Sequence, residues 1–174
     1  LESKIGDLLR RMSLEEKVAQ LTSVPIGLLI EGTGFSEQKA AKLLAGGIGQ
    51  ITRLAGGAYI TPSQAAEAGN RIQKFLLEKT RLGIPALVHE ECLAGLMAKG
   101  AAAFPVPIAM ASTWEPELIR QVTREIARSV RAIGGHQGLC PVLDVARDPR
   151  WGRVEETFGE DPFLAARMGV AYVK

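Results

Sequence analysis

The sequence has almost no excess of charge, no long apolar run, and only two cysteines and two histidines. A net charge of +2 gives no basic footprint for nucleic acid, so nucleic acid is not expected as a partner. No apolar run approaches the roughly 20 residues that span a bilayer, so a membrane is not expected as a partner either. Because the chain begins with Leu1 rather than Met, the question whether a signal segment was removed or omitted stays open. The choice between a cytoplasmic and a secreted protein stays open as well.

The few cysteines and histidines carry no metal-site signature. Cys92 and Cys140 lie in or beside apolar runs, which favours small core residues, and a disulfide between them is the alternative. His89 and His136 are far apart in the sequence, and neither belongs to a metal-ligand spacing. No metal and no cofactor is therefore expected.

The composition is that of an ordinary soluble domain, with 47% hydrophobic and 23% charged residues in a chain of 174. Apolar runs typical of buried strands alternate with amphipathic helical patterns in about four successive units. The predicted strands lie within residues 21–30, 48–52, 84–88 and 139–145, and the predicted helices at 3–12, 13–21, 36–44, 61–76, 116–133 and from 162 onward. Repeated strand–helix units predict an α/β fold with a parallel sheet and helices outside it.

Four such units are half of a TIM-type (β/α)8 barrel, which usually takes about 250 residues. Residues 1–174 are therefore expected to form one incomplete domain, about the first half of a barrel. A half-barrel leaves two strand edges unpaired. We expect the chain to self-associate or to need its missing half.

A charge-dense loop follows directly on the predicted buried strand at 139–145 and ends at Asp161-Pro162, a helix-start signal. Active sites of parallel α/β folds are built from such loops at the carboxyl ends of strands. A salt-bridged surface loop is the alternative. Trp151-Gly152-Arg153 favours a site, because an aromatic platform, a backbone without Cβ and a cation with five donors suit a polar, ring-shaped ligand.

The run Asp148-Pro149-Arg150-Trp151-Gly152-Arg153 with Phe158-Gly159-Glu160-Asp161-Pro162 closely resembles glycoside hydrolase family 3, the β-glucosidase and β-xylosidase family. Further segments agree in order, namely Ser13 to Leu21, Ile84-Pro85 leading to His89-Glu90-Glu91, Phe104-Pro105, and Ser112 to Leu118. The pattern is unlike the N-acetylhexosaminidase branch of that family. The resemblance extends over nearly the whole chain. It implies a retaining enzyme that hydrolyses O-glycosyl bonds at the non-reducing end of β-glycosides.

The resemblance also assigns roles in the −1 sugar subsite. Arg153 matches the family arginine that grips sugar hydroxyls, and Glu91 aligns with the acid of the family's Asp-x-x-His-Gly segment, which holds hydroxyls on the far side of the sugar. Trp151 is either a sugar platform or part of the loop core. Two departures remove polar groups near this site: Ala94 replaces the usual histidine, and Val106 replaces the glutamine that commonly follows Phe-Pro.

No catalytic residue can be matched within the chain. A retaining hydrolase needs two carboxyl groups about 5 Å apart across the scissile bond. Glu90 and Glu91 are neighbours at a strand end and point to opposite faces, so they do not form that pair. In the family, the nucleophilic aspartate and the general acid come from later regions, so the chain alone is expected to be inactive. We interpret Glu90, Arg147, Asp148 and Arg150 as an ion-pair network that holds the loop.

Two other functions compete with the glycosidase interpretation. One is a non-catalytic half-barrel that acts as a folding or assembly module. The other is a barrel enzyme for a sugar phosphate, which is disfavoured because phosphate sites usually lie after the seventh and eighth strands.

Overall fold

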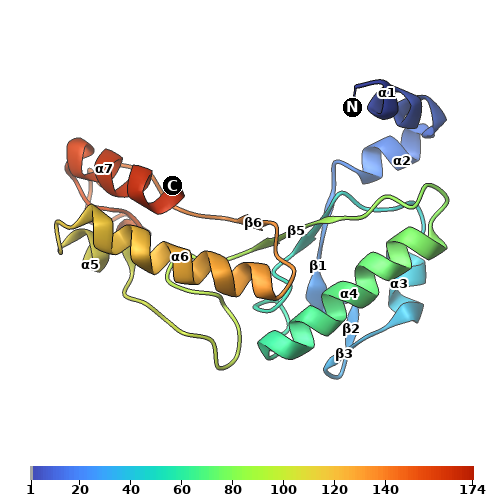
Figure 1. Cartoon of the computed structure of the whole chain (residues 1–174), viewed down its shortest axis with the longest axis horizontal. Helices are drawn as coiled ribbons and strands as arrows, with labels where there is room; N and C mark the ends of the chain where they lie inside the picture. The colour runs from blue at the N-terminus through green and yellow to red at the C-terminus, as the bar shows by residue number, and fades with distance from the viewer. Residues whose placement is uncertain (1) are drawn as a thin grey trace.

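Four short parallel strands form the sheet of the computed structural model, which describes residues 2–174 (Figure 1). Their spatial order is β1-β4-β5-β6, so each strand adds to the edge left by the strand before it in the chain. The strands are β1 (Ser23–Pro25), β4 (Gln50–Thr52), β5 (Leu87–Glu90) and β6 (Gln137–Gly138), with a separate antiparallel pair of β2 (Ile30–Glu31) and β3 (Gly34–Phe35). The predicted α/β fold with a parallel sheet is confirmed.

The helices begin where the sequence places strong start signals. Ser13 and Thr61 each complete a capping box, with Glu16 and Gln64 respectively, and the Asp161 carboxylate accepts a hydrogen bond from the Leu164 N–H. The helices are α1 (Glu2–Arg11), α2 (Leu14–Ala19), α3 (Glu37–Leu43), α4 (Pro62–Lys79), α5 (Pro107–Ala111), α6 (Pro116–Ala132) and α7 (Pro162–Val173), with 3-10 turns η1 (Ile26–Leu28) and η2 (Val154–Glu156). Six of these seven helices match the predicted ranges.

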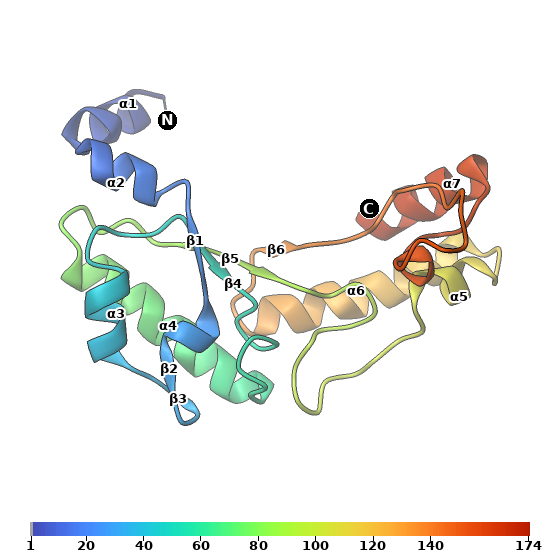
Figure 2. The ribbon, with the colours of Figure 1, turned by 180° about the vertical axis from the view of Figure 1, so that it is seen from behind.

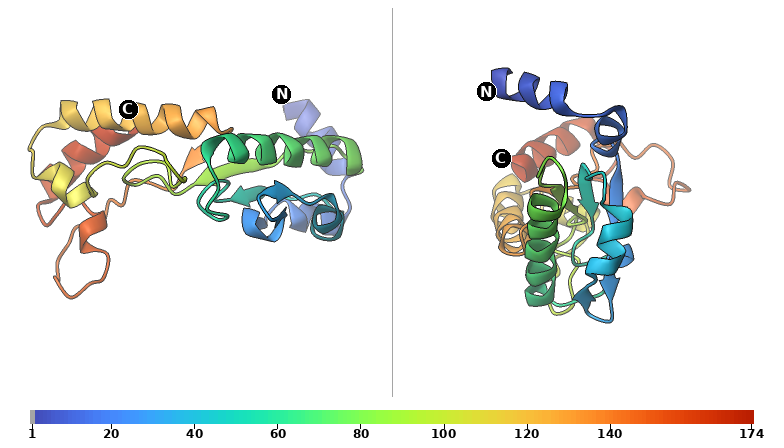
Figure 3. Two further views of the ribbon diagram at one scale, coloured as in Figure 1. Left: turned by 90° about the horizontal axis from the view of Figure 1, so that it is seen from below. Right: turned by 90° about the vertical axis from the view of Figure 1, so that its right-hand side faces the viewer.

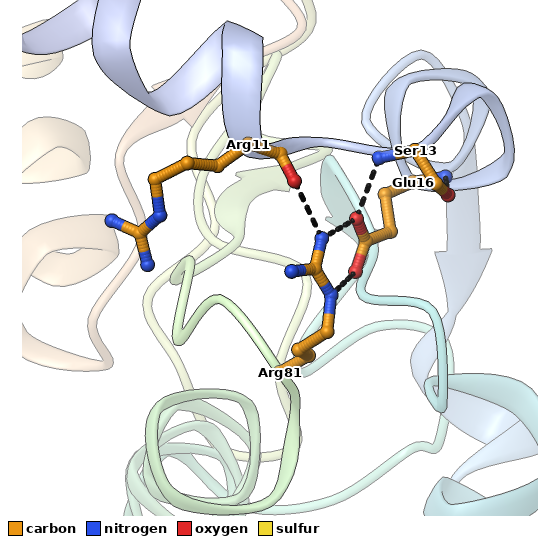
Figure 4. Close-up of polar contacts among 4 residues, drawn as sticks. All are labelled: Arg11, Ser13, Glu16 and Arg81. Carbon is orange, nitrogen blue, oxygen red and sulfur yellow. Dashed lines mark hydrogen bonds and ion pairs between the residues drawn. The ribbon is translucent and has the colours of Figure 1, made fainter.

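Helices α1 and α2 stand apart from the rest of the molecule and bury no side chain of their own (Figure 2). An ion pair attaches them to the segment before β5 (Figure 4). Arg81 Nε donates to Glu16 Oε1 at 2.8 Å, and Arg81 Nη2 donates to the Arg11 carbonyl at 2.7 Å. The hydrogen bond from Arg81 is the main reason that the pKa of Glu16 falls to about 2.

The hydrophobic core has two parts. The larger part lies between the sheet and helices α3, α4 and α6, and the smaller part joins α5 and α7 to the start of α6. Figure 3 shows α4 and α6 on the same side of the strands and the loop with η2 projecting from the far end. Val122 and Cys140 pack against both parts, so the core is continuous through the middle of the molecule.

The prediction of a buried strand at 139–145 is wrong. The last strand is β6, two residues earlier, and the segment after it is extended without strand pairing; Leu139 is 41% exposed and Leu143 is 55% exposed. Among residues 2–174, β6 pairs with β5 alone, so this apolar segment lacks a neighbour on its other side. An apolar groove of about 500 Å3 lies between Leu143, Val145 and the exposed face of α7.

Candidate functional site

Three charged side chains reach one cavity from the carboxyl ends of three neighbouring strands. Arg53 directly follows β4, Glu91 directly follows β5, and Arg153 lies in the loop that follows β6. All three line a cavity of about 760 Å3. The structure therefore brings together Glu91 and Arg153, the two residues that the sequence predicted to bind a sugar, although 62 positions of the chain separate them.

Arg53 is the site residue that sequence reasoning missed. Its Nη2 donates to Glu91 Oε1 at 3.0 Å, and the two side chains are 49% and 30% exposed. The backbone of Arg53 has a φ of +55°, in the left-handed region, and its N–H donates to the His89 carbonyl at 2.9 Å. The sequence does contain a signal for Arg53, namely its position immediately after the predicted strand at 48–52. Because the carboxyl ends of parallel strands lie at the same edge of a sheet, a charged residue at that position is a candidate for the site.

Arg153 is held at the cavity by an acid three residues later in the chain. Its Nε donates to Glu156 Oε2 at 3.0 Å, and Nη2 contacts the same oxygen. This hydrogen bond is the main reason that the pKa of Arg153 rises and the pKa of Glu156 falls. The contact occupies two of the five guanidinium donors, so the group can also bind further oxygen atoms.

The lining of the cavity has a charged part and an apolar part. Glu155 and Glu156 join the three charged residues, whereas the segment after Glu91 supplies mainly alanine and other apolar side chains. Ala94 and Val106, the two departures from the family pattern, both lie in this apolar part. Such a mixed lining is typical of sites for polar ligands with an apolar face.

Trp151 does not line this cavity. It is 38% exposed and lies in a turn, where its N–H donates to the Asp148 carbonyl at 3.1 Å and its carbonyl accepts from the Val154 N–H at 3.3 Å. It belongs to neither part of the hydrophobic core. Trp151 is therefore not among the residues that line the cavity with Glu91 and Arg153.

The predicted ion-pair network is only partly present. Arg150 binds Asp148 through Nη2 at 2.6 Å, and this contact holds the pKa of Asp148 below its usual range. Within residues 2–174, Arg147 makes no ion pair. Glu90 does not join the network either, because it lies inside β5 with its side chain fully buried.

Glu90 instead supports the glycine-containing loop after β4. Its Oε1 accepts a hydrogen bond from the Ala55 N–H at 2.5 Å, and its Oε2 has no partner among the described residues. Burial raises the pKa of Glu90 to about 7, although hydrogen bonds from backbone N–H groups oppose this rise. Because Ala55 lies two residues after Arg53, this contact helps to fix the loop that presents Arg53 to Glu91.

No group of three or more His, Cys, Asp or Glu side chains in residues 2–174 is arranged to hold a metal ion. The described helices are also too short or too polar to cross a membrane.

Comparison with known proteins gives one consistent match. Residues 13–174 match the family described as "Glycosyl hydrolase family 3 N terminal domain". The chain is 37% identical to a putative beta-xylosidase of Formosa agariphila, over 98% of this chain and 23% of that protein. It is 34% identical to a periplasmic beta-glucosidase/beta-xylosidase of Dickeya chrysanthemi, over 98% of this chain and 28% of that protein.

Solved structures agree with the sequence match. A beta-glucosidase from Listeria innocua, solved in complex with glucose, superimposes with a TM-score of 0.80 and 31% identity over 99% of this chain and 23% of that chain. A β-glucosidase from Erythrobacter marinus gives the same TM-score with 35% identity over 95% of this chain and 22% of that chain. The predicted partial (β/α)8-type fold is thereby confirmed, and the chain spans less than a third of the length of these proteins.

Proposed function

The chain belongs to glycosyl hydrolase family 3, and we propose from this that it supplies part of the −1 sugar subsite of a retaining β-glycosidase of the β-xylosidase or β-glucosidase type. In this proposal, residues 1–174 are the N-terminal portion of a catalytic barrel. The observation that carries it is the convergence of Glu91, Arg53 and Arg153 on one cavity from three successive strand ends.

The charged part of the lining suits a ring that carries several hydroxyl groups. The Glu91 carboxylate accepts hydrogen bonds from hydroxyl donors, and the Arg153 guanidinium donates to hydroxyl oxygens. Arg53 uses Glu91 Oε1, so we assign Glu91 Oε2 to a hydroxyl of the sugar. Arg53 then acts as a positioning residue that orients the carboxylate, and the apolar part of the lining packs against the ring carbons.

The reaction itself needs groups that this site does not provide. The two carboxyl groups of a retaining hydrolase stand about 5 Å apart on either side of the glycosidic bond. Glu90 is fully buried and bound to the Ala55 N–H, so it does not pair with Glu91 across a substrate. We therefore assign nucleophile and general acid to other parts of a longer protein, and this chain to substrate binding.

The exposed edge of β6 and the apolar groove beside α7 fit a chain that is completed by further structure. Leu143, Val170 and Val173 are each more than half exposed along this groove. Their exposure also favours the second candidate, a half-barrel assembly module that associates with itself. A substrate such as a β-linked oligosaccharide is the expected ligand in the first case, and a second copy of the chain in the other.

Assays with aryl β-glucoside and aryl β-xyloside test the proposal directly. The isolated chain should give no turnover, whereas the full-length protein should hydrolyse at least one of them. In the full-length protein, Arg53→Ala should lower kcat/KM, because Glu91 loses the partner that orients it, while Arg124→Ala on the exposed face of α6 should leave it unchanged. If the isolated chain did turn over substrate, and Arg153→Lys abolished that turnover, the assignment of catalysis to other parts of a longer protein would be contradicted.

A further inference from the structure

Cys92 and Cys140 face each other across neighbouring strand ends. Strands β5 and β6 pair in parallel with His89 opposite Gln137 and Glu90 opposite Gly138. Continuing this register by two residues places Cys92 opposite Cys140, and their Sγ atoms are 3.3 Å apart. Neighbouring strands lie about 4.8 Å apart, within the Cα separation of about 4.4–6.8 Å that a disulfide requires. Both cysteines are free thiols in the structure.

The space for the two sulfur atoms comes from Gly138. A Cβ atom at this position would lie 2.5 Å from Cys92 Sγ and 3.0 Å from Cys140 Sγ, both closer than ordinary packing allows. A third element fixes the backbone beside the sulfurs, because the Tyr172 hydroxyl of α7 donates to the carbonyls of Cys92 at 3.0 Å and Leu93 at 3.1 Å. The pair is therefore held by β5, β6 and α7 together.

The two thiols differ in accessibility and acidity. Cys92 is 3% exposed, whereas Cys140 is half-buried, and both line a cavity of about 270 Å3 beside α6. The hydrogen bond between them raises the pKa of Cys92, with burial adding to the effect, and lowers the pKa of Cys140. A thiolate rather than a thiol is the nucleophile in disulfide exchange, so Cys140 is the group that reacts first.

We propose that Cys92 and Cys140 form an internal disulfide site whose oxidant is a small disulfide of the glutathione type. The Cys140 thiolate attacks one sulfur of the small disulfide, whose S–S bond breaks and releases one thiolate. Cys92 then gives its proton to solvent and attacks Cys140 Sγ, which expels the second small thiol. Two protein thiols are oxidised, and one small disulfide is reduced to two thiols.

The bond would join the two strand ends that carry the candidate sugar site. Cys92 directly follows Glu91, and Cys140 opens the segment that leads to the loop of Arg153. Since 48 positions separate the two cysteines, the cross-link also restricts a long stretch of the unfolded chain. The inference rests on the geometry of the thiols and holds whether or not the cavity binds a sugar.

The test is to treat the purified chain with oxidised glutathione, alkylate the remaining thiols and measure the intact mass. The wild-type chain should lose both alkylable thiols without a disulfide link to a second chain, retain no glutathione, and melt about 5–15 °C higher until dithiothreitol reverses the change. Cys92→Ser should stop at a glutathione adduct on Cys140. Cys140→Ser should stay unmodified while folded, since Cys92 is buried.

Two outcomes would overturn the proposal. One is a folded wild-type chain that keeps two alkylable thiols under conditions in which the urea-unfolded chain reacts. The other is a wild-type chain that retains glutathione or links only to a second chain. Gly138→Ala provides a control of geometry, because the added Cβ displaces both sulfurs and should slow the internal step severalfold without removing a thiol.

Discussion

Replacing Glu90 by glutamine should remove a pH dependence that this residue imposes on folding. Glu90 is fully buried, and its Oε2 has no partner among the described residues. Burial raises the pKa of the carboxyl group from 4.5 to about 7 in the folded chain. One pKa unit is worth about 1.4 kcal/mol, so this rise amounts to about 3 kcal/mol.

The direction of the effect follows from proton binding. Between pH 4.5 and about 7, folded Glu90 keeps a proton that the unfolded chain has already released. The free energy of unfolding contributed by this group therefore falls as the pH rises through that window, and the full loss of about 3 kcal/mol is reached above pH 7. His89 acts in the opposite direction, because burial lowers its pKa and the folded chain then binds a proton less readily than the unfolded chain.

Urea unfolding at several pH values between 5 and 8 separates the two contributions, because His89 is present in both the wild type and Glu90→Gln. Glutamine adds buried N–H donors near the unpartnered position, which lowers stability by about 1–3 kcal/mol at every pH. The difference in unfolding free energy between wild type and variant should nevertheless change by about 3 kcal/mol between pH 5 and pH 8. Glu78→Gln on the exposed face of α4 is the matched control, and its unfolding free energy should depend on pH in the same way as that of the wild type. Parallel curves for the wild type and Glu90→Gln would refute the reasoning.

Further predictions concern the sugar site and the exposed edge. In the full-length protein, Arg153→Lys should lower kcat/KM by at least about tenfold, or roughly 1.4 kcal/mol, because a point charge does not reproduce a bidentate grip; unchanged kinetics at full expression would exclude this role. In the proposed subsite, the Glu91 carboxylate should reach roughly 1.3 Å further than an aspartate would and should crowd the C6 group of a hexose. The enzyme should therefore prefer aryl β-xyloside, with Glu91→Asp shifting the kcat/KM ratio toward glucoside by up to about 1–3 kcal/mol; a strong glucoside preference that the substitution leaves unmoved would contradict this. The isolated chain should self-associate at micromolar concentration, and Leu143→Glu in the apolar groove should weaken that association; a cooperative wild-type monomer by light scattering would count against it.

Local signals in the sequence determined most of the helices and the class of the fold. The capping boxes at Ser13 and Thr61 involve side chains only three positions from their partners, so the sequence contains the whole interaction. Alternation of apolar runs and amphipathic helices was enough to predict a parallel sheet, because each strand–helix unit restricts where the next strand can lie. The motif resemblance in the sequence also marks Arg153 and Glu91 as candidate site residues.

The tertiary structure decided which of these residues meet and which are buried. A charged residue next to a strand end carries no local information about the residue that it will face. The Arg53–Glu91 pair and the burial of Glu90 therefore depend on the pairing of β4 with β5, which only the tertiary structure shows. The apolar run at 139–145 has the composition of a buried strand, but burial needs partners on both sides, and within residues 2–174 β6 pairs with one strand. The proximity of Cys92 and Cys140 is likewise not determined by the sequence near either residue. The register of β5 against β6 places their sulfur atoms 3.3 Å apart.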